Sequence, residues 1–339
     1  MIVGIKVCKT VPGEHLMRVA GLFLRRLITG ALFIYGGCVS AQDTYPSKLI
    51  RIIVPFTAGS APDVFARMLA RSLESRIGQS VIIEARPGAN SILGASLAAK
   101  AAPDGYTILY ATSSATSAAK ALFKSLPYDP INDLAALTIF QELYLVLLVK
   151  SDEKGVGFAQ FLEKIRRNPA SFSTAGASST AEILDRMIDR ATGKPEHVYI
   201  RYSNSSTMVN DLLGGRLGGA FHTVSGALPL IQSGQAFAIA VSSPVTLSRL
   251  PNVPTMKTTL PGVELGTWSG FFVPAKTPRV VINALYKPLA VILKEPEFVR
   301  WSEESGRALQ MTPDEADAFV RAEEQRWTSL GRMAGIQPE

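Results

Sequence analysis

The stretch from Ile50 to Arg67 constrains the fold of this chain more than any other segment. The apolar, β-branched run Leu49–Phe56 is typical of a strand buried on both faces of a parallel sheet. A turn of small residues follows, and Pro62 and Asp63 then open a helix. A strand, a small-residue turn and a helix start leave backbone N–H groups unpaired and pointing outward. Because such groups bind anions, we predict an anion-binding turn here.

Size and composition indicate a compact protein with two domains. The chain has 339 residues, of which 47% are apolar and 19% are charged. That length is sufficient for two hydrophobic cores, and the composition differs from that of disordered chains.

The first 41 residues have the features of an export signal. Arginines precede the apolar run 27–39, which is shorter than the roughly 20 residues that span a bilayer. The small residues Val39-Ser40-Ala41 form a cleavage site, so we expect cleavage after Ala41 and a periplasmic mature protein. Two alternatives stay open: Met17 as the true start, and a lipid anchor at Cys38.

Cleavage changes the composition of the mature chain. Both cysteines, Cys8 and Cys38, lie before the cut, which suits an oxidising compartment. The removed segment carries five basic residues and one acidic residue, so the formal charge falls from +7 to +3. Nucleic-acid binding thereby loses its main support, whereas a mildly cationic body still suits a small anionic ligand.

Strand and helix patterns alternate after residue 42, which predicts an α/β fold with parallel sheets. The first half is typical of a doubly wound βαβαβ unit. Its expected strands are 49–56, 80–84 and 106–111, and its expected helices are 64–77 and an Ala-rich segment from the turn at 86–90 to about 101.

A second half follows the same logic and ends in three helices. Its expected strands are 144–149, 171–175, 197–201, 219–222, 236–241 and 267–273. Its expected helices are 158–167, 179–191, 207–213, 227–233, 279–293, 296–305 and 313–330, and the Pro-rich piece 244–261 is expected to be a surface loop.

An ordered set of short motifs resembles the extracytoplasmic receptors of tripartite tricarboxylate transporters, called the Bug family. The resemblance covers the chain from about Tyr45 to its end, and the order and spacing of the motifs carry it. The motifs are Tyr45-Pro46-Ser47-Lys48, the loop 54–67, Arg86-Pro87-Gly88-Ala89-Asn90, Ala101-Ala102-Pro103-Asp104-Gly105-Tyr106-Thr107, Leu126-Pro127-Tyr128-Asp129-Pro130, Asp211-Leu212-Leu213-Gly214-Gly215 and Leu250-Pro251-Asn252-Val253-Pro254-Thr255.

The resemblance implies two doubly wound α/β domains joined by two crossovers, the type II periplasmic binding fold. It places domain 1 at 46–143 plus 266–339 and domain 2 at 144–265. It implies a solute-binding protein, expected as a monomer, that closes around a small carboxylate. The ligand would then pass to a membrane permease with one large and one small integral subunit. No cofactor, metal or catalytic residue is implied.

Ligands of open parallel sheets bind beyond the carboxyl ends of the strands, which selects five loops. The loops 56–63 and 174–180 mirror each other as strand, small residues and helix, although Ser60, Pro62, Ala177 and Ser178 depart from the family pattern. For Asp63 we favour a role at the helix start over an acid role. The candidate ligand-binding residues are Phe56, Thr57, Ala58, Gly59, Ser60, Asp63, Asn90, Thr112, Ser113, Thr174, Gly176, Ser178, Ser179, Tyr202, His222 and Thr223.

His222 stands where the family commonly has Asp. A cleft Asp would suit an ammonium group on the ligand, and His removes that anion. We therefore predict a mono- or dicarboxylate without an amino group. The alternative interpretation makes His222 a neutral, hydrogen-bonded wall residue.

Two other function classes have different support in the sequence. The sequence offers few residues for catalysis, because G-x-S-x-G, P-loop and G-x-G-x-x-G motifs are missing and only His197 and His222 remain after processing. A receptor for a membrane sensor kinase would share the fold and the ligand, and the sequence does not separate it from a transport receptor.

Overall fold

We describe a computed structural model of the chain over residues 45–169, 172–193, 197–335 and 338. Tyr45–Glu339 forms one compact unit by its internal contacts. The predicted signal peptide, its cleavage site and both cysteines lie outside the described residues. Among the helices of the described segments, none combines the length and the apolarity that a bilayer crossing needs.

The described strands form one mixed sheet of ten strands in the order β2-β1-β3-β9-β4-β7-β5-β6, with β8 and β10 also paired to β4. Strands β1, β2 and β3 are mutually parallel, as are β5, β6 and β7, whereas β9 and β4 join the two sets by antiparallel pairing. The strands are β1 Ile50–Val54, β2 Val81–Ala85, β3 Thr107–Thr112, β4 Leu134–Lys150, β5 Ser173–Gly176, β6 Val198–Arg201, β7 Gly219–Thr223, β8 Ala236–Val241, β9 Gly266–Pro274 and β10 Gly306–Ala308.

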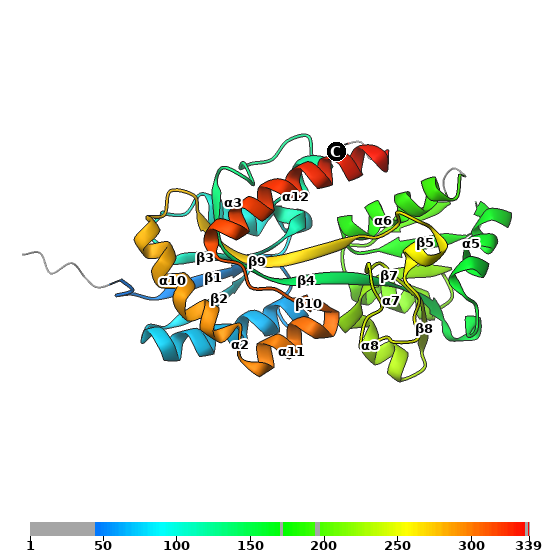
Figure 1. Cartoon of the computed structure of the whole chain (residues 1–339), viewed down its shortest axis with the longest axis horizontal. Helices are drawn as coiled ribbons and strands as arrows, with labels where there is room; N and C mark the ends of the chain where they lie inside the picture. Colours follow the sequence, from blue (N-terminus) through cyan, green and yellow to red (C-terminus); the bar gives the residue numbers. More distant parts are fainter. Residues whose placement is uncertain (1–44, 170–171, 194–196, 336–337, 339) are drawn as a thin grey trace, which may run out of the picture. The chain divides into compact units, whose positions relative to one another are not determined.

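Helices cover both faces of this sheet (Figure 1). The α-helices are α2 Ala61–Ile77, α3 Ile92–Ala99, α4 Ala119–Leu122, α5 Phe158–Arg167, α6 Ser179–Ala191, α7 Ser205–Leu213, α8 Val224–Gln232, α9 Met256–Thr259, α10 Arg279–Ile292, α11 Pro296–Ser305 and α12 Pro313–Met333. Three short 3-10 helices are η1 Ala89–Ser91, η2 Ser113–Ala115 and η3 Ser151–Glu153.

Strand β4 is much longer than the predicted segment 144–149. The prediction was too short because polar residues interrupt the apolar pattern in the first half of the strand. Thr138 and Gln141 are buried in it, and their side chains donate to the carbonyls of Met311 (2.8 Å) and Ser302 (3.1 Å). These bonds satisfy the polar groups inside the fold, so the strand continues through them. The predicted boundary between residues 143 and 144 falls inside β4, and the one between 265 and 266 falls just before β9, so the two predicted domains share β4.

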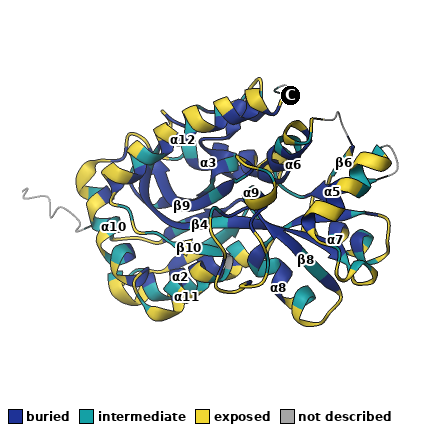
Figure 2. Cartoon of the chain, turned by 45° about the vertical axis from the view of Figure 1, so that its right-hand side comes forward, coloured by how far each residue is buried: buried dark blue, intermediate teal, exposed yellow. Residues whose placement is uncertain are grey.

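Four buried clusters fill the two faces of the sheet. Alternate residues of β4 enter different clusters, with Leu147 on one face and Val146 and Leu148 on the other, as a pleated strand requires. The yellow, exposed side of each helix faces away from the dark blue strands (Figure 2). The sheet is therefore buried along both faces, and the ends of its strands remain for a site.

One smaller prediction was wrong, and one short strand was not predicted. The piece 244–261 contains the short helix α9, and Gly306–Ala308 forms a strand that the sequence pattern did not indicate. Both are three or four residues long, too short to show a period. β10 exists because it pairs with Gln141–Leu143 of β4.

Candidate ligand-binding site

The first predicted loop follows β1 and is shaped by Asp63. The buried Asp63 carboxylate accepts the Gly59 N–H (2.9 Å) and the Arg67 Nε–H (2.9 Å), and its other oxygen accepts Arg67 Nη2 (3.2 Å). The Arg67 hydrogen bond holds the pKa of Asp63 below its ordinary value. Thr57, Ala58 and Gly59 are exposed, with Gly59 at φ 80°. The carboxylate of Asp63 is thus engaged in fixing the turn.

Asn90 lies in a turn with unusual backbone geometry. Ala89, Asn90 and Ser91 have φ angles of 45°, 51° and 74°, all in the left-handed region that non-glycine residues avoid. Ser91 Oγ donates to the Pro55 carbonyl at the end of β1 (3.3 Å), which ties this turn to the first loop. Such strain costs about 1–3 kcal/mol per residue and clusters at functional sites.

The third loop follows β3, the other neighbour of β1. Ser113 is fully buried, and its hydroxyl lies 2.6 Å from that of Thr267 on β9. Thr112 is half-buried. Sequence reasoning missed Thr267, because a single hydroxyl at the start of a strand carries no local signal.

The loop between β5 and α6 presents an open helix start. Ser178 is the N-cap of α6, and its hydroxyl accepts the Ala181 N–H at 3.3 Å. In the described part of the chain, no acceptor is paired with the amides of residues 177–180. These N–H groups and the positive end of the helix dipole suit a carboxylate.

The two sets of loops meet at Asn90. Its amide nitrogen Nδ2 lies 3.3 Å from the Ser179 hydroxyl at the first residue of α6. The left-handed turn after β2 and the helix start after β5 are therefore neighbours, although 89 positions separate these residues in the sequence.

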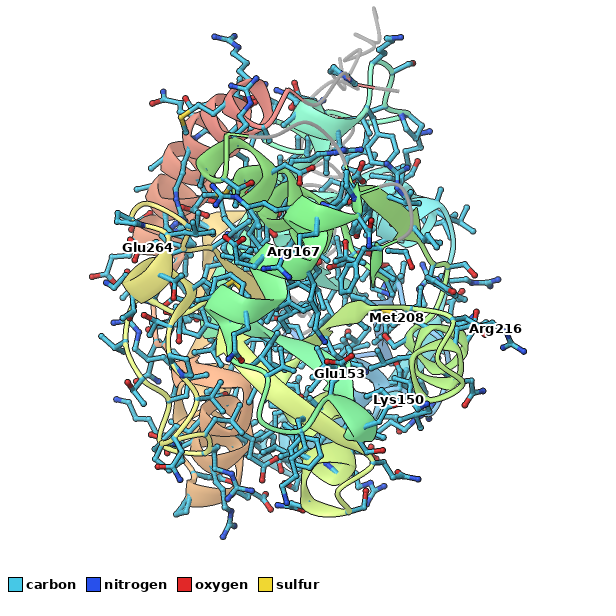
Figure 3. The ribbon with its side chains drawn as sticks, turned by 90° about the vertical axis from the view of Figure 1, so that its right-hand side faces the viewer. Lys150, Glu153, Arg167, Met208, Arg216 and Glu264 are labelled. Atoms are coloured by element: carbon cyan, nitrogen blue, oxygen red, sulfur yellow. The ribbon has the colours of Figure 1, made fainter. Side chains whose placement is uncertain are left out.

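Two predicted residues have side chains that are engaged elsewhere. Thr174 is 1% exposed, and its hydroxyl donates to Asp185 Oδ1 (2.6 Å) inside the fold. Tyr202 Oη donates to Asp211 Oδ2 (2.6 Å), and the other Asp211 oxygen accepts Arg216 Nη1 (2.5 Å). The side chain of Arg216 is exposed and points away from the molecule (Figure 3). At Gly176 the carbonyl accepts the Tyr202 N–H (2.9 Å).

His222 and Thr223 end β7 beside this loop, since Phe221 of β7 pairs with Gly176 of β5. The half-buried His222 places Nδ1 3.2 Å from the Thr223 carbonyl, to which a neutral ring donates. Burial lowers the pKa of His222, and the bond to Thr223 opposes this only in part. His222 is therefore a neutral donor at neutral pH.

One group of side chains in the described residues is close enough to share a metal ion. Asp185, Asp189 and His197 each offer an atom within 4.8 Å of the others. Both ring nitrogens of His197 already lie at hydrogen-bonding distance from a carboxylate oxygen, Nδ1 2.7 Å from Asp189 Oδ1 and Nε2 3.1 Å from Asp185 Oδ1. A ring that donates from both nitrogens has no lone pair for a metal.

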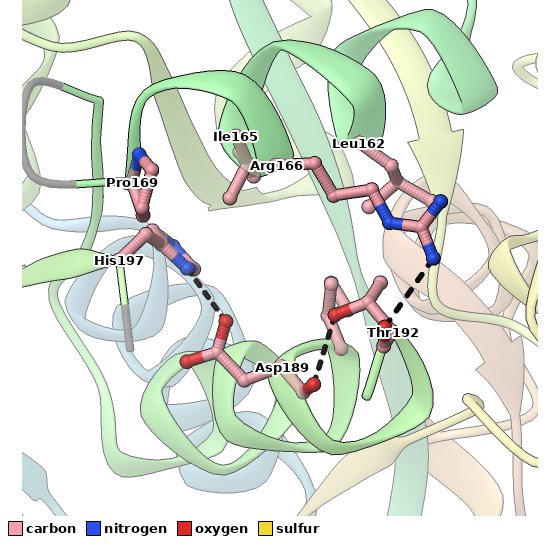
Figure 4. Close-up of a pocket in the computed structure, with 8 residues that line it drawn as sticks. Leu162, Ile165, Arg166, Pro169, Asp189, Thr192 and His197 are labelled. Carbon is pink, nitrogen blue, oxygen red and sulfur yellow. Dashed lines mark hydrogen bonds and ion pairs between the residues drawn. The ribbon is translucent and has the colours of Figure 1, made fainter. Parts of the chain in front are cut away.

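A small pocket opens beside this group, away from the loops above (Figure 4). Half of its eight lining residues are apolar, and the other half, which includes His197 and Asp189, are polar or charged. It is lined by Leu162, Ile165, Arg166, Pro169, Ile188, Asp189, Thr192 and His197.

Comparisons with known proteins identify the family of this chain. The sequence profile of a family described as "Tripartite tricarboxylate transporter family receptor" matches residues 65–336. Protein BugT of Bordetella pertussis is 32% identical over 304 residues, which are 88% of this chain and 92% of that protein.

Two solved structures match the fold. The periplasmic binding protein BugD is 28% identical with a TM-score of 0.78, over 87% of this chain and 100% of that one. R. palustris Rpa4515 with adipate is 25% identical with a TM-score of 0.80, again over 87% of this chain and 100% of that one.

Proposed function

Because this chain belongs to the tripartite tricarboxylate transporter receptors, periplasmic binding proteins rather than enzymes, we propose that it captures a small carboxylate and delivers it to a tripartite membrane permease. The ligand would lie between the loops that follow β1, β2 and β3 and those that follow β5, β6 and β7. The expected contacts are the amides of Thr57 and Ala58 in the first loop, Asn90, the amides of residues 177–180, and His222; the Gly59 and Ser60 amides already donate within the turn.

The contact between Asn90 and Ser179 carries this proposal. It brings a strained polar turn, a feature that clusters at functional sites, next to a helix start whose open amides favour an anion. Micromolar affinity needs about 8 kcal/mol net. Hydrogen bonds to a charged group contribute about 1.5–3 kcal/mol each, so four to six of them suffice after ordering costs. No buried arginine is required.

We further propose that the ligand has no amino group. His222 is neutral and donates to the Thr223 carbonyl, so it supplies no negative charge to hold an ammonium. An ammonium buried without an anionic partner would be strongly disfavoured. A dicarboxylate is the preferred candidate, in keeping with the adipate in the structure of R. palustris Rpa4515.

A thermal-shift screen tests the ligand class. The purified mature chain is heated with malate, adipate, other mono- and dicarboxylates, and the amino acids aspartate and glutamate. We expect at least one carboxylate without an amino group to raise the melting temperature, since saturation at 100 times Kd stabilises by about 2.7 kcal/mol. The variant His222→Asp should lose that response and gain one to an amino acid.

Two results would contradict the proposal. If none of the carboxylates stabilises the protein, the proposed binding function is refuted. If only amino acids stabilise it, the proposed ligand class is refuted. Delivery is tested by uptake of the labelled ligand in cells with and without the gene. Uptake should fall without the gene and return when it is supplied on a plasmid.

A further inference from the structure

A buried network of charged and polar side chains lies behind the loop at 177–180. His197, just before β6, is 3% exposed, and Asp185 of α6 is fully buried. His197 Nδ1 is 2.7 Å from Asp189 Oδ1, and Nε2 is 2.7 Å from the hydroxyl of Thr174 on β5. Thr174 in turn donates to Asp185 Oδ1 at 2.6 Å. The network therefore connects β5, α6 and the start of β6.

The hydrogen bonds assign the charge of His197. Thr174 has one hydroxyl proton and gives it to Asp185, so its oxygen accepts a proton from Nε2. Nδ1 faces the Asp189 carboxylate and donates to it. Burial by itself lowers the pKa of His197, but the hydrogen bonds and charges of Asp185 and Asp189 outweigh it and raise the pKa to about 9. His197 is therefore a buried cation at neutral pH.

Other charged or titratable groups face this cation from the surrounding elements. On α6, Arg186 Nη1 lies 3.8 Å from Asp189 Oδ2. On β6, burial and the charge of Asp185 raise the pKa of Tyr199, which keeps that hydroxyl neutral. On α5, Arg166 lines the same pocket as His197 and donates to the Thr192 carbonyl at 3.4 Å.

The connection between β5 and α6 is short and tightly packed. Only Ala177 and Ser178 separate the last residue of β5 from the first of α6. A Cβ on Gly176 would lie 2.3 Å from Ala181 Cβ and 2.5 Å from Tyr199 Oη, so strand and helix are at closest approach. The direction of the loop amides consequently follows from how α6 is held against β5.

We propose that His197 is a positioning residue, a buried cation that clamps α6 to β5 and so aims the amides of residues 177–180 at the ligand without touching it. This rests on the proposed function for the ligand itself. The clamp is a feature of the free protein as well, so it can be measured before any ligand is known.

Hydrogen exchange followed by mass spectrometry tests the clamp. In His197→Gln, which keeps an N–H donor group but loses the charge, we measure the loop peptide, residues 177–185, in which the amides of Ala181 and Glu182 are hydrogen-bonded to the Ser178 carbonyl. We expect this peptide to exchange about tenfold faster or more. A reference peptide from α2 should change much less. In the wild type, protection of the loop peptide, corrected for intrinsic exchange, should fall as pH rises through about 9, and this step should be missing in His197→Gln.

Thr174→Val is the second variant, because it removes the hydroxyl link to α6 and keeps the contact between His197 and Asp189. It should speed exchange of the loop peptide in the same direction by a smaller factor. Affinity for adipate, or for the best carboxylate of the screen, should fall in proportion to the loss of loop protection.

Unchanged loop exchange in His197→Gln and Thr174→Val would overturn the inference, and so would a uniform increase in every peptide or a wild-type loop without the pH step. A failure of the proposed binding function gives a different result. In that case no carboxylate stabilises the wild type in the thermal-shift screen, whereas the exchange of the loop peptide can still show the clamp.

Discussion

Asn90 offers a test that separates backbone strain from ligand contact. The change is Asn90→Ala compared with Asn90→Gly, both of which remove the side chain that reaches the Ser179 hydroxyl at 3.3 Å. The two variants differ in how they tolerate φ 51° at this position. Glycine adopts that conformation freely, whereas alanine does not.

The expected magnitudes follow from this geometry. The long, partly exposed hydrogen bond to Ser179 contributes about 0.5–1.5 kcal/mol. Alanine at a left-handed position adds about 1–2 kcal/mol, so Asn90→Ala should lower the free energy of unfolding by about 2 kcal/mol in total. Asn90→Gly should lie within about 1 kcal/mol of the wild type, because relief of strain offsets the lost bond.

Ligand affinity should respond differently from stability. Both variants would lose the hydrogen bond that we propose from Asn90 to the carboxylate, worth about 1.5–3 kcal/mol, so affinity should fall about tenfold to a hundredfold in each. Urea denaturation measures the unfolding free energy, and calorimetry measures the affinity for the carboxylate that the screen identifies. Equal stability of the two variants would refute the strain argument, and unchanged affinity in both would refute a ligand contact by Asn90.

Three further predictions concern the groups behind the two loops. The folded pKa of His197, about 9, exceeds the unfolded value of 6.5, so its stabilisation is fully present below pH 6.5 and is lost as pH rises through 9. The unfolding free energy of the wild type minus that of His197→Gln should therefore shrink by up to about 3 kcal/mol over this range, and a constant difference in urea denaturation would contradict the assignment. Gly176→Ala places a methyl group 2.3 Å from Ala181 Cβ, which should lower the free energy of unfolding by about 1–3 kcal/mol and weaken ligand binding. Thermal unfolding and calorimetry measure the two effects, and wild-type values in both would show that the loop adjusts without cost. Asp63→Asn keeps the shape of the side chain but leaves Arg67 without its charged partner, so the unfolding free energy at neutral pH should fall by about 1 kcal/mol or more. Because the pKa of Asp63 is lowered in the fold, its contribution is present above the unfolded pKa and lost in acid, and the deficit of the variant should vanish there.

Much of the secondary structure was accessible from local patterns. The helices Phe158–Arg167 and Ser179–Ala191 and the strand Ala236–Val241 coincide with the predicted ranges. Each has a clear period and a stop signal in its own residues, and backbone hydrogen bonds of a helix are local. The family and the mixed α/β fold were likewise recognised from motif order, as the profile match and the BugD structure confirm.

Strand β4 shows where secondary-structure prediction from local sequence fails. Its central residues Thr138 and Gln141 are polar, and they belong to a strand because partners from residues 302 and 311 satisfy them. Those partners lie more than 160 positions away, so no window of sequence around β4 contains the reason. The same holds for the Ser113–Thr267 contact, which no motif indicated.

The sequence by itself determined which turns expose small residues and open amides at the ends of strands, because these depend on glycine, proline and capping residues within a few positions. Only the tertiary structure decided that Asn90 meets Ser179, that Thr174 turns inward to Asp185, and that His197 carries a charge. The physical reason is that side-chain contact and protonation depend on distance in space, which packing of the sheet sets and chain order does not.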